Sequence, residues 1–243
     1  MRFNTKLLHG NKMGDANTGA TLTPVYQSSA FYQPSAEQHE KLFHNKATGF
    51  SYTRINNPTI FAFEERMTTL EGGIASVACA SGMAAITNAL LNIVTCGQEI
   101  VASTSLYGGS IDVFHDFEAF GIKTVFVDIS DVNAVEAAIN ENTRVIFAET
   151  IGNPKLDVVD IEALAELAHQ HDLPLVMDNT VATAYLVKPI EKGADIVVNS
   201  TSKYINGNSN AISGVITESG RFKLNKEKYP RVAEYARLGK MAY

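Results

Sequence analysis

Short apolar runs alternate with segments of helical periodicity along most of this chain, and this alternation limits the possible folds more than any other feature. Runs such as Ile196-Val197-Val198 have the β-branched composition of strands that are buried on both faces. Because helical stretches separate successive runs, each strand is expected to reach the next through a right-handed crossover. The sequence therefore predicts an α/β fold with a largely parallel sheet and helices on both of its faces.

The expected elements follow from these periodicities and from the turn residues between them. The first long helix is expected to start at Asn57-Pro58-Thr59, with Thr59 as its N-cap, and to stop at Gly72-Gly73. Further helices are predicted after residue 82 and over residues 111–120, 132–140, 161–170 and 226–243. Strands are predicted over residues 75–79, 99–102, 123–127, 144–148, 174–179, 196–199 and 211–217.

The first 57 residues differ from the rest because they show no sustained helical or strand periodicity. Their aromatic residues, among them Phe31, Phe50 and Tyr52, argue against a disordered segment. We therefore expect residues 1–57 to be an arm that reaches a neighbouring subunit, and residues 58–243 to form a large ligand-binding domain.

Composition excludes several classes of function. A net charge of −6 argues against nucleic acid or an anionic membrane as the main partner. The sequence contains no apolar run of the length that a membrane helix needs, and its two cysteines form no CxxC pair, so we expect a soluble protein of the reducing cytoplasm. The six histidines form no HExxH or similar pattern, and no metal site is expected.

A lysine follows the strand at residues 196–199, within the hydroxyl-rich run Ser200-Thr201-Ser202-Lys203. Asp178 likewise ends the preceding apolar run. Ligands of open parallel sheets gather beyond the carboxyl ends of the strands, so an amine and an acid are expected to meet there. For a lysine taken alone, a solvated turn is the more common explanation. Together with the acid, the lysine is the pairing expected of a pyridoxal phosphate enzyme.

Three other strand ends carry groups that suit the same cofactor. Gly82 and Met83 open a helix, where free N–H groups attract phosphate, although Ser-Gly before a helix is more often just a cap. Tyr107 follows another strand, and Glu149 and Asn153 follow a third, although loops without function are the default for each. These signals gain weight because all of them fall at one edge of one sheet.

Six motifs, in order and spacing, resemble the Cys/Met-metabolism (trans-sulfuration) family of pyridoxal phosphate enzymes. They are Ser-Tyr-Thr-Arg-Ile-Asn-Asn-Pro-Thr (51–59), Ala-Ser-Gly-Met-Ala-Ala-Ile (80–86), Tyr-Gly-Gly-Ser (107–110), Glu-Thr-Ile-Gly-Asn-Pro (149–154), Asp-Asn-Thr (178–180) and Ser-Thr-Ser-Lys-Tyr (200–204). The resemblance covers the whole chain and implies the large domain of a fold type I transferase that depends on pyridoxal 5'-phosphate.

The resemblance also implies a role for each residue at the sheet edge. Lys203 would join the cofactor covalently and move protons, Asp178 would face the ring nitrogen, and Tyr107 would stack on the ring and assist catalysis. The remaining expected contacts are phosphate binding by Gly82, Met83, Ser200 and Ser202, phosphate binding by Tyr52 and Arg54 of a neighbouring subunit, contact with the cofactor's phenolic oxygen by Asn153, positions near the ring for Glu149 and Thr180, and substrate binding by Glu149 and Asn153.

The activity that the resemblance implies is γ-replacement, in which sulfide displaces acetate from O-acetyl-L-homoserine to give L-homocysteine. Cystathionine γ-synthase, cystathionine γ-lyase and methionine γ-lyase chemistry are the alternatives, and Gly109, where the resembling methionine γ-lyases have cysteine, favours replacement. A homotetramer built of two active dimers is expected. Because the family's smaller C-terminal domain is expected to be absent, a cofactor-loaded assembly or sulfur-carrier partner without turnover is a further alternative.

Overall fold

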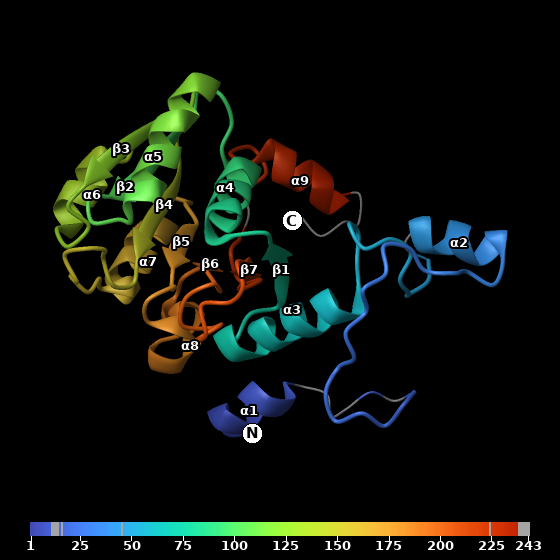
Figure 1. Cartoon of the computed structure of the whole chain (residues 1–243). Helices are drawn as coiled ribbons and strands as arrows, with labels where there is room; N and C mark the ends of the chain where they lie inside the picture. The colour runs from blue at the N-terminus through green and yellow to red at the C-terminus, as the bar shows by residue number, and fades with distance from the viewer. Residues whose placement is uncertain (11–14, 16, 45, 224, 238–243) are drawn as a thin grey trace.

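The structure is a computed structural model, and it describes residues 1–10, 15, 17–44, 46–223 and 225–237. Its centre is a sheet of seven strands in the order β1-β7-β6-β5-β4-β2-β3 (Figure 1). The strands are β1 (Ala75–Cys79), β2 (Glu99–Ser103), β3 (Lys123–Val127), β4 (Thr143–Glu149), β5 (Leu175–Asp178), β6 (Ile196–Asn199) and β7 (Gly214–Glu218). β7 runs antiparallel to both of its neighbours, and the other pairings are parallel. The expected α/β architecture with a mostly parallel sheet is confirmed.

Helices cover both faces of this sheet. They are α3 (Pro58–Glu71), α4 (Gly82–Ile93), α5 (Gly108–Asp116), η1 (Phe117–Phe120), α6 (Val132–Ala138), α7 (Ile161–Gln170), α8 (Thr183–Leu186), η2 (Pro189–Lys192) and α9 (Pro230–Arg237). Alternation along β2 shows how the faces divide. Ile100 and Ala102 pack in one core with residues of α4 and α5, whereas Val101 packs in the other with residues of α6 and α7. Strands that are apolar on both faces are therefore a consequence of this three-layer packing.

The register of the parallel strands brings their carboxyl ends to one edge. Glu149 at the end of β4 pairs with Asp178 at the end of β5, and Asp178 pairs with Val198 of β6. The backbone N–H of Asn179 continues this ladder by donating to the Val198 carbonyl over 2.9 Å. The turns that leave β1, β2, β4, β5 and β6 therefore begin on the same side of the sheet, as the sequence predicts.

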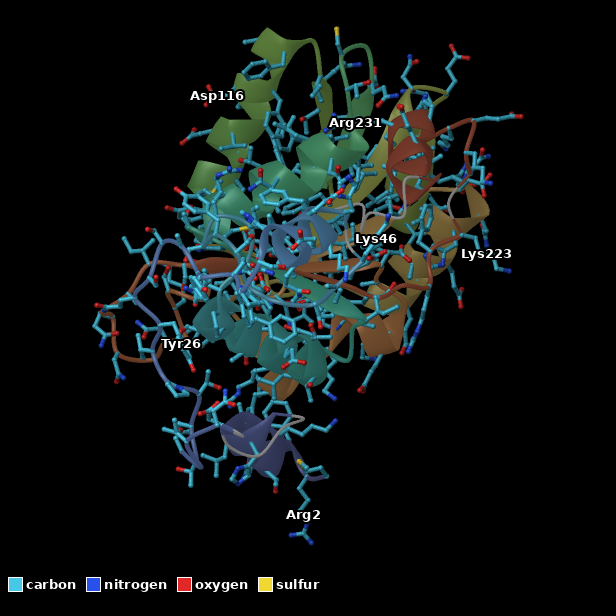
Figure 2. All side chains as sticks on the ribbon, turned by 90° about the vertical axis from the view of Figure 1, so that its right-hand side faces the viewer. Arg2, Tyr26, Lys46, Asp116, Lys223 and Arg231 are labelled. Carbon is cyan, nitrogen blue, oxygen red and sulfur yellow. The ribbon has the colours of Figure 1, made fainter. Side chains whose placement is uncertain are left out.

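The arm contains two helices that the sequence pattern did not predict, α1 (Phe3–His9) and α2 (Ala36–Phe43). Neither helix buries a residue, and α2 projects away from the sheet in Figure 1. Both are short, and an N-cap explains α2, because Ser35 Oγ accepts from Gln38 N over 3.2 Å. Figure 2 shows Arg2, just before α1, at one tip of the molecule and Tyr26 of the arm at its side.

The start of α3 differs from the prediction. Its N-cap is Asn57 rather than Thr59, because Asn57 Oδ1 accepts from Thr59 N over 2.8 Å and Pro58 occupies the first helical position. The Thr59 hydroxyl instead accepts from Tyr26 N over 2.8 Å. Thr59 therefore fastens the arm to the first long helix.

Other element boundaries shift by a few residues. The predicted helix 111–120 is α5 followed by the 3₁₀ turn η1, and the predicted strand 211–217 begins only at Gly214. The predicted helix 226–243 begins at Pro230, since a proline is suited to the first turn of a helix, and its last part, residues 238–243, lies outside the described residues.

β1 stands at one end of the sheet order, where a strand exposes unpaired backbone groups. A side chain of α3 covers part of this edge, because Ala78 N donates to Glu64 Oε1 over 2.8 Å. Burial raises the pKa of the half-buried Glu64 carboxyl.

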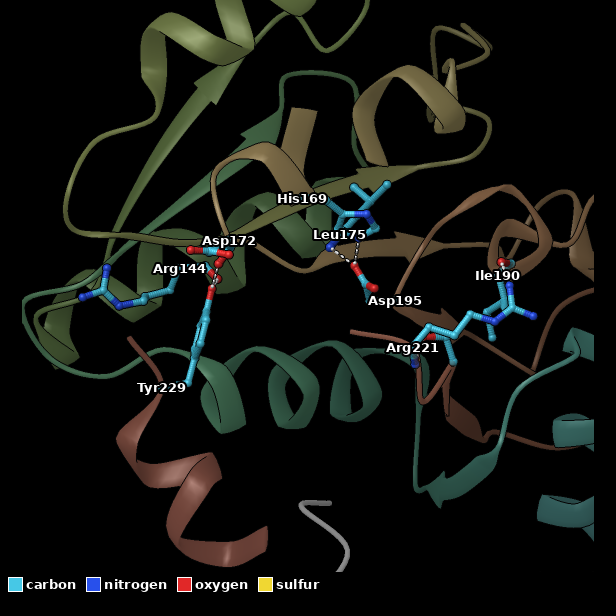
Figure 3. Close-up of polar contacts among 9 residues, drawn as sticks. Arg144, His169, Asp172, Leu175, Ile190, Asp195, Arg221 and Tyr229 are labelled. Carbon is cyan, nitrogen blue, oxygen red and sulfur yellow. Dashed lines mark hydrogen bonds and ion pairs between the residues drawn. The ribbon is translucent and has the colours of Figure 1, made fainter. Parts of the chain in front are cut away.

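Polar contacts also join segments at the amino ends of the interior strands β4, β5 and β6 (Figure 3). Asp195 Oδ2 accepts from Leu175 N over 2.8 Å and contacts His169 Nε2 at 2.9 Å. The Tyr229 hydroxyl lies 2.8 Å from the Arg144 carbonyl and 2.9 Å from the Asp172 carbonyl. These groups join the segment before α9 to the start of β4 and the end of α7.

Candidate active site at the carboxyl ends of the strands

The start of α4 forms a cradle against the turn after β6. Ser81 caps this helix, with its Oγ accepting from Ala84 N over 3.0 Å, and Gly82 is the first helical residue. A Cβ placed on buried Gly82 would overlap the Cβ of Ser200, so only glycine lets the two segments meet. Free N–H groups at the first turn of α4, which contains Met83, therefore lie beside the Ser200 hydroxyl, an arrangement suited to phosphate.

Asp178 is the last residue of β5 and is 8% exposed. Its Oδ1 accepts from Thr180 N over 2.9 Å, and burial raises the pKa of its carboxyl despite this bond. Thr180 Oγ1 in turn accepts from Ser200 N over 2.7 Å. The structure thus links the acid to the phosphate cradle through Thr180.

Glu149, at the end of β4, is also buried. Its Oε1 accepts from Tyr107 N over 2.6 Å. Burial raises the pKa of Glu149 to about 8, and the neighbouring Asp178 and Asp157 carboxylates add to this effect. The Tyr107 side chain is exposed and lies against Gly109, where an added Cβ would stand 2.6 Å from Tyr107 Cε1. Glu149 thus holds the backbone from which this ring projects.

Asn153 lies in the exposed loop that follows β4. This loop is fastened to the end of β2, because Ser105 Oγ donates to Asp157 Oδ1 over 2.5 Å. Gly152 N also donates to the Asp157 carbonyl over 2.9 Å. The fastening keeps Asn153 at the same edge of the sheet as Glu149.

Lys203 lies in the turn that follows β6. Its side chain is exposed, and its amine makes no hydrogen bond or ion pair with any residue that the structure describes. The hydroxyl of Ser202 is engaged, since it accepts from Ser213 N over 2.9 Å and donates to the Ser213 carbonyl over 3.1 Å. A phosphate contact would require Ser202 to release that carbonyl.

Tyr52 and Arg54 do not join this group. They lie together in the arm, with Arg54 Cζ 5.6 Å from the centre of the Tyr52 ring. In the described part of the chain, neither side chain forms a hydrogen bond or ion pair with the strand-end residues. They line an open hollow of about 500 Å³, together with Tyr26, Gln27, Ser28, Ser29, Thr53 and Asn57.

One buried acid near this edge was missed by the sequence analysis. Glu71, the last residue of α3, is fully buried and contacts the side-chain amides of Asn179 and Asn199. A carboxylate at a helix C-terminus is disfavoured by the helix dipole. That unfavourable position, directly before Gly72-Gly73, is the signal that could have drawn attention to Glu71.

The residues at this edge fit the expected pyridoxal phosphate. The cradle of Gly82 and Ser200 offers N–H and hydroxyl donors for a phosphate. Burial raises the pKa of the Asp178 carboxyl, and a protonated ring nitrogen beside it would favour the ionised form of this acid. Exposed Lys203 and Tyr107 offer an amine and an aromatic face on the turns beside these groups.

The described residues also bear on other classes of function. Among the described residues, no three His, Cys, Asp or Glu side chains gather where they could hold a metal ion. Within the same residues, no helix has the length and apolar character needed to cross a bilayer.

Curated relatives match nearly the whole chain. O-acetyl-L-homoserine sulfhydrylase of Leptospira meyeri is 44% identical over 231 residues, which are 95% of this chain and 52% of that protein. L-methionine gamma-lyase of Fusobacterium nucleatum subsp. polymorphum is 44% identical over 200 residues, which are 82% of this chain and 51% of that protein. The chain therefore spans about half the length of the curated relatives that it matches.

Solved structures share the fold. A putative O-acetylhomoserine (thiol)-lyase from Campylobacter jejuni, solved with a pyridoxyl-lysine monophosphate, matches with a TM-score of 0.89 and 33% identity, covering 94% of this chain and 57% of that one. Cystathionine gamma-lyase from Lactobacillus plantarum, in complex with L-serine, matches with a TM-score of 0.83 and 38% identity, covering 99% and 60%. The profile of the family described as Cys/Met metabolism PLP-dependent enzyme matches residues 4–239. The chain belongs to this family of pyridoxal phosphate-dependent enzymes.

Proposed function

We propose that the complete protein catalyses a pyridoxal phosphate-dependent γ-replacement, in which sulfide displaces acetate from O-acetyl-L-homoserine to give L-homocysteine. The names of several similar proteins support this choice, because they include O-acetyl-L-homoserine sulfhydrylase and homocysteine synthase. Methionine gamma-lyases are similarly close in sequence. The names of similar proteins therefore do not decide between γ-replacement and the lyase reaction, and the choice depends on the residues of the site.

Gly109 is the observation that carries the choice of replacement over the lyase reaction. The Tyr107 ring lies against Gly109, and a Cβ there would stand 2.6 Å from Tyr107 Cε1. A cysteine, which the resembling methionine γ-lyases have at this position, would push the ring away. With glycine at position 109, the Tyr107 ring therefore lies at a different place relative to the leaving group than it would beside a cysteine.

The cofactor, when bound, supplies an aldehyde that joins amines and a protonated ring that draws electrons from the substrate. Lys203 carries the amine that bonds to the cofactor, and when free this amine moves protons at the substrate carbons. Asp178, as an anion, keeps the ring nitrogen protonated. Tyr107 stacks on the ring and assists at the leaving group, and Glu149 and Asn153 bind the substrate.

The phosphate is held by the first turn of α4 at Gly82 and Met83, with hydroxyls from the turn after β6. Thr180 supports both the acid and this turn through its bond to Ser200 N. Tyr52 and Arg54 complete the phosphate site of a neighbouring subunit, which accords with their separation from the strand ends of their own chain. The proposal therefore includes residues 1–57 as an intersubunit arm, residues 58–243 as the cofactor domain, and a cytoplasmic homotetramer of two active dimers.

Replacement of Lys203 by Ala in the complete protein tests this proposal. We expect loss of the visible absorbance of the protein-bound cofactor and of acetate release from O-acetyl-L-homoserine with sulfide. Lys192→Ala is the control, because Lys192 precedes the amino end of β6 and forms an exposed ion pair with Glu162 over 2.9 Å. Turnover that persists in Lys203→Ala would overturn the mechanism.

A substrate panel separates the alternatives. Sulfide or cysteine is offered to the wild-type protein together with O-acetyl-L-homoserine, and methionine is offered alone. Methanethiol release from methionine would identify a lyase, and cystathionine formed from cysteine would identify a γ-synthase. Cystathionine is offered as a further substrate, and its cleavage would identify cystathionine γ-lyase. A yellow protein that releases no acetate would support a cofactor-loaded partner without turnover.

A further inference from the structure

A buried polar cluster lies beneath the phosphate cradle, formed by Glu71, Asn179 and Asn199. All three side chains are fully buried. Asn199 Nδ2 donates to Glu71 Oε1 over 2.9 Å, and Asn179 Nδ2 approaches the same oxygen at 3.4 Å. A single carboxyl oxygen from the end of α3 therefore accepts from the ends of two neighbouring strands.

The two asparagines flank the residues to which we assign cofactor contacts. Asn179 stands between Asp178 and Thr180, and Asn199 directly precedes Ser200. Asn179 Nδ2 also donates to the Val187 carbonyl over 3.0 Å, which ties the same amide to the segment after α8. The position of the Glu71 carboxyl thus bears on the spacing between the ring end and the phosphate end of the site.

Packing alone does not account for this cluster. Glu71 Oε2, Asn179 Oδ1 and Asn199 Oδ1 are buried and find no hydrogen-bond partner among the described residues. Burial raises the pKa of Glu71 to about 7, against the effects of both amides and of Lys188, whose amine bonds to Glu191 over 2.8 Å. An apolar residue of the same length would avoid these costs. Retaining the acid requires a compensating role.

We propose that Glu71 is a positioning residue for the cofactor, which holds Asn179 and Asn199 at the spacing that lets Asp178 and Ser200 act on opposite ends of one bound molecule. The carboxyl touches neither substrate nor cofactor and acts only through the two amides. This inference rests on the proposed function, because it takes Asp178 and Ser200 as cofactor contacts.

The test compares ligands that use one end of the site with a ligand that uses both. Apo forms of the complete protein are titrated with pyridoxal 5'-phosphate, with pyridoxal and with inorganic phosphate. Glu71→Met removes the acceptor at similar length, and we expect it to weaken pyridoxal 5'-phosphate binding roughly tenfold or more, while each fragment loses less than about threefold. Glu71→Gln keeps the acceptor and offers a donor to an unpartnered amide oxygen, so it should restore binding.

The matched controls are Glu64→Met and Glu64→Gln. Glu64 is an acid of the same helix that accepts a backbone N–H of β1. Replacement of Glu64 should lower thermal stability without selectively weakening the binding of pyridoxal 5'-phosphate, the ligand that uses both ends of the site. If Glu71→Met does not fold, Asn199→Ala replaces it, and the same selective loss is expected.

Four results are decisive. Equal weakening of all three ligands, or lowered stability with unchanged affinities, would reduce Glu71 to a structural role and overturn the proposal. Failure of Glu71→Gln to restore binding would also overturn it, because the acceptor would then not be the relevant group. Absence of pyridoxal 5'-phosphate binding in the wild-type protein would instead refute the proposed function.

Discussion

Glu149 and Asp178 are direct partners across the parallel strands β4 and β5, so two buried carboxyl groups end adjacent strands side by side. Burial raises the pKa of both carboxyls, and the Asp178 carboxylate makes the ionised form of Glu149 still less favourable. The pair is therefore suited to a site that brings a positive charge of its own. A protonated cofactor ring beside Asp178 is such a charge.

The free energy of unfolding of the apo protein should fall as pH rises from 4.5 to about 8. The folded state holds a proton on Glu149 up to a pKa of about 8, whereas the unfolded chain loses it near the ordinary value of 4.5. This stabilisation is complete below the lower value and is lost as pH approaches the higher one. Each such group contributes a slope of at most about 1.4 kcal/mol per pH unit. Urea unfolding between these two pH values measures it.

Glu149→Gln should flatten that slope, because glutamine still accepts from Tyr107 N but does not titrate. The variant should be more stable than wild type at the upper end of the range. Glu166→Gln, at an exposed position on α7, serves as control and should leave the slope unchanged. A Glu149→Gln protein with the wild-type slope would contradict the raised pKa.

Gly82→Ala should damage the phosphate cradle. The new methyl group would overlap the Ser200 side chain, and we expect a loss of about 1–3 kcal/mol in stability and weaker binding of phosphate-bearing ligands. Gly108→Ala is the matched control, since Gly108 is the first residue of α5 and an added Cβ meets open space. Calorimetric titration of both variants with inorganic phosphate makes the comparison. Equal affinities would argue against a phosphate site at this helix start.

Gly109→Cys should move the Tyr107 ring. Since an added Cβ would stand 2.6 Å from Tyr107 Cε1, the exposed ring must rotate away from α5. We expect the ratio of γ-replacement to methionine cleavage to fall at least about tenfold, because the ring assists at the leaving group. Product analysis with O-acetyl-L-homoserine and with methionine measures the ratio. An unchanged ratio would remove the argument from Gly109.

Tyr229→Phe should lower stability and spare the site. Its hydroxyl can donate to only one of the Arg144 and Asp172 carbonyls at a time, and removing it leaves both without this donor (Figure 3). A loss of about 1–2 kcal/mol is expected in urea unfolding. Cofactor affinity should stay at the wild-type value, since these contacts lie at the other end of the strands. A marked drop in affinity would show coupling across the sheet.

The fold was predictable because its signals are local. Runs such as Ile196-Val197-Val198 and the alternating helices define a parallel sheet from composition alone, and the carboxyl edge then follows from geometry. The helix α2 was not predictable in this way, because its eight residues contain only two large apolar side chains, Leu42 and Phe43, which are too few to repeat at a helical period. The reversed direction of β7 also depends on pairing partners that lie far away in the sequence.

Residues of the candidate site likewise fall into those that local sequence could predict and those that it could not. Asp178 and Lys203 could be expected at one edge because each directly follows a strand. The engagement of Ser202 with Ser213 and the burial of Glu71 could not be foreseen, since both depend on contacts across the tertiary structure. In the proposed assembly, Tyr52 and Arg54 act in a neighbouring subunit, which no pattern within one chain can position.

The pairing of β1 with β7 joins the first strand to the last, from Ala75 with Glu218 to Cys79 with Gly214. The cradle at Ser81 and Gly82 directly follows β1, so it can reach its final form only after residue 218 has been synthesised. During translation, the phosphate-binding turn therefore cannot be completed until β7 has been synthesised and has paired with β1. Pairing between strands that are this distant in sequence forms slowly. A nascent chain stalled before β7 is therefore expected to be unable to capture its cofactor.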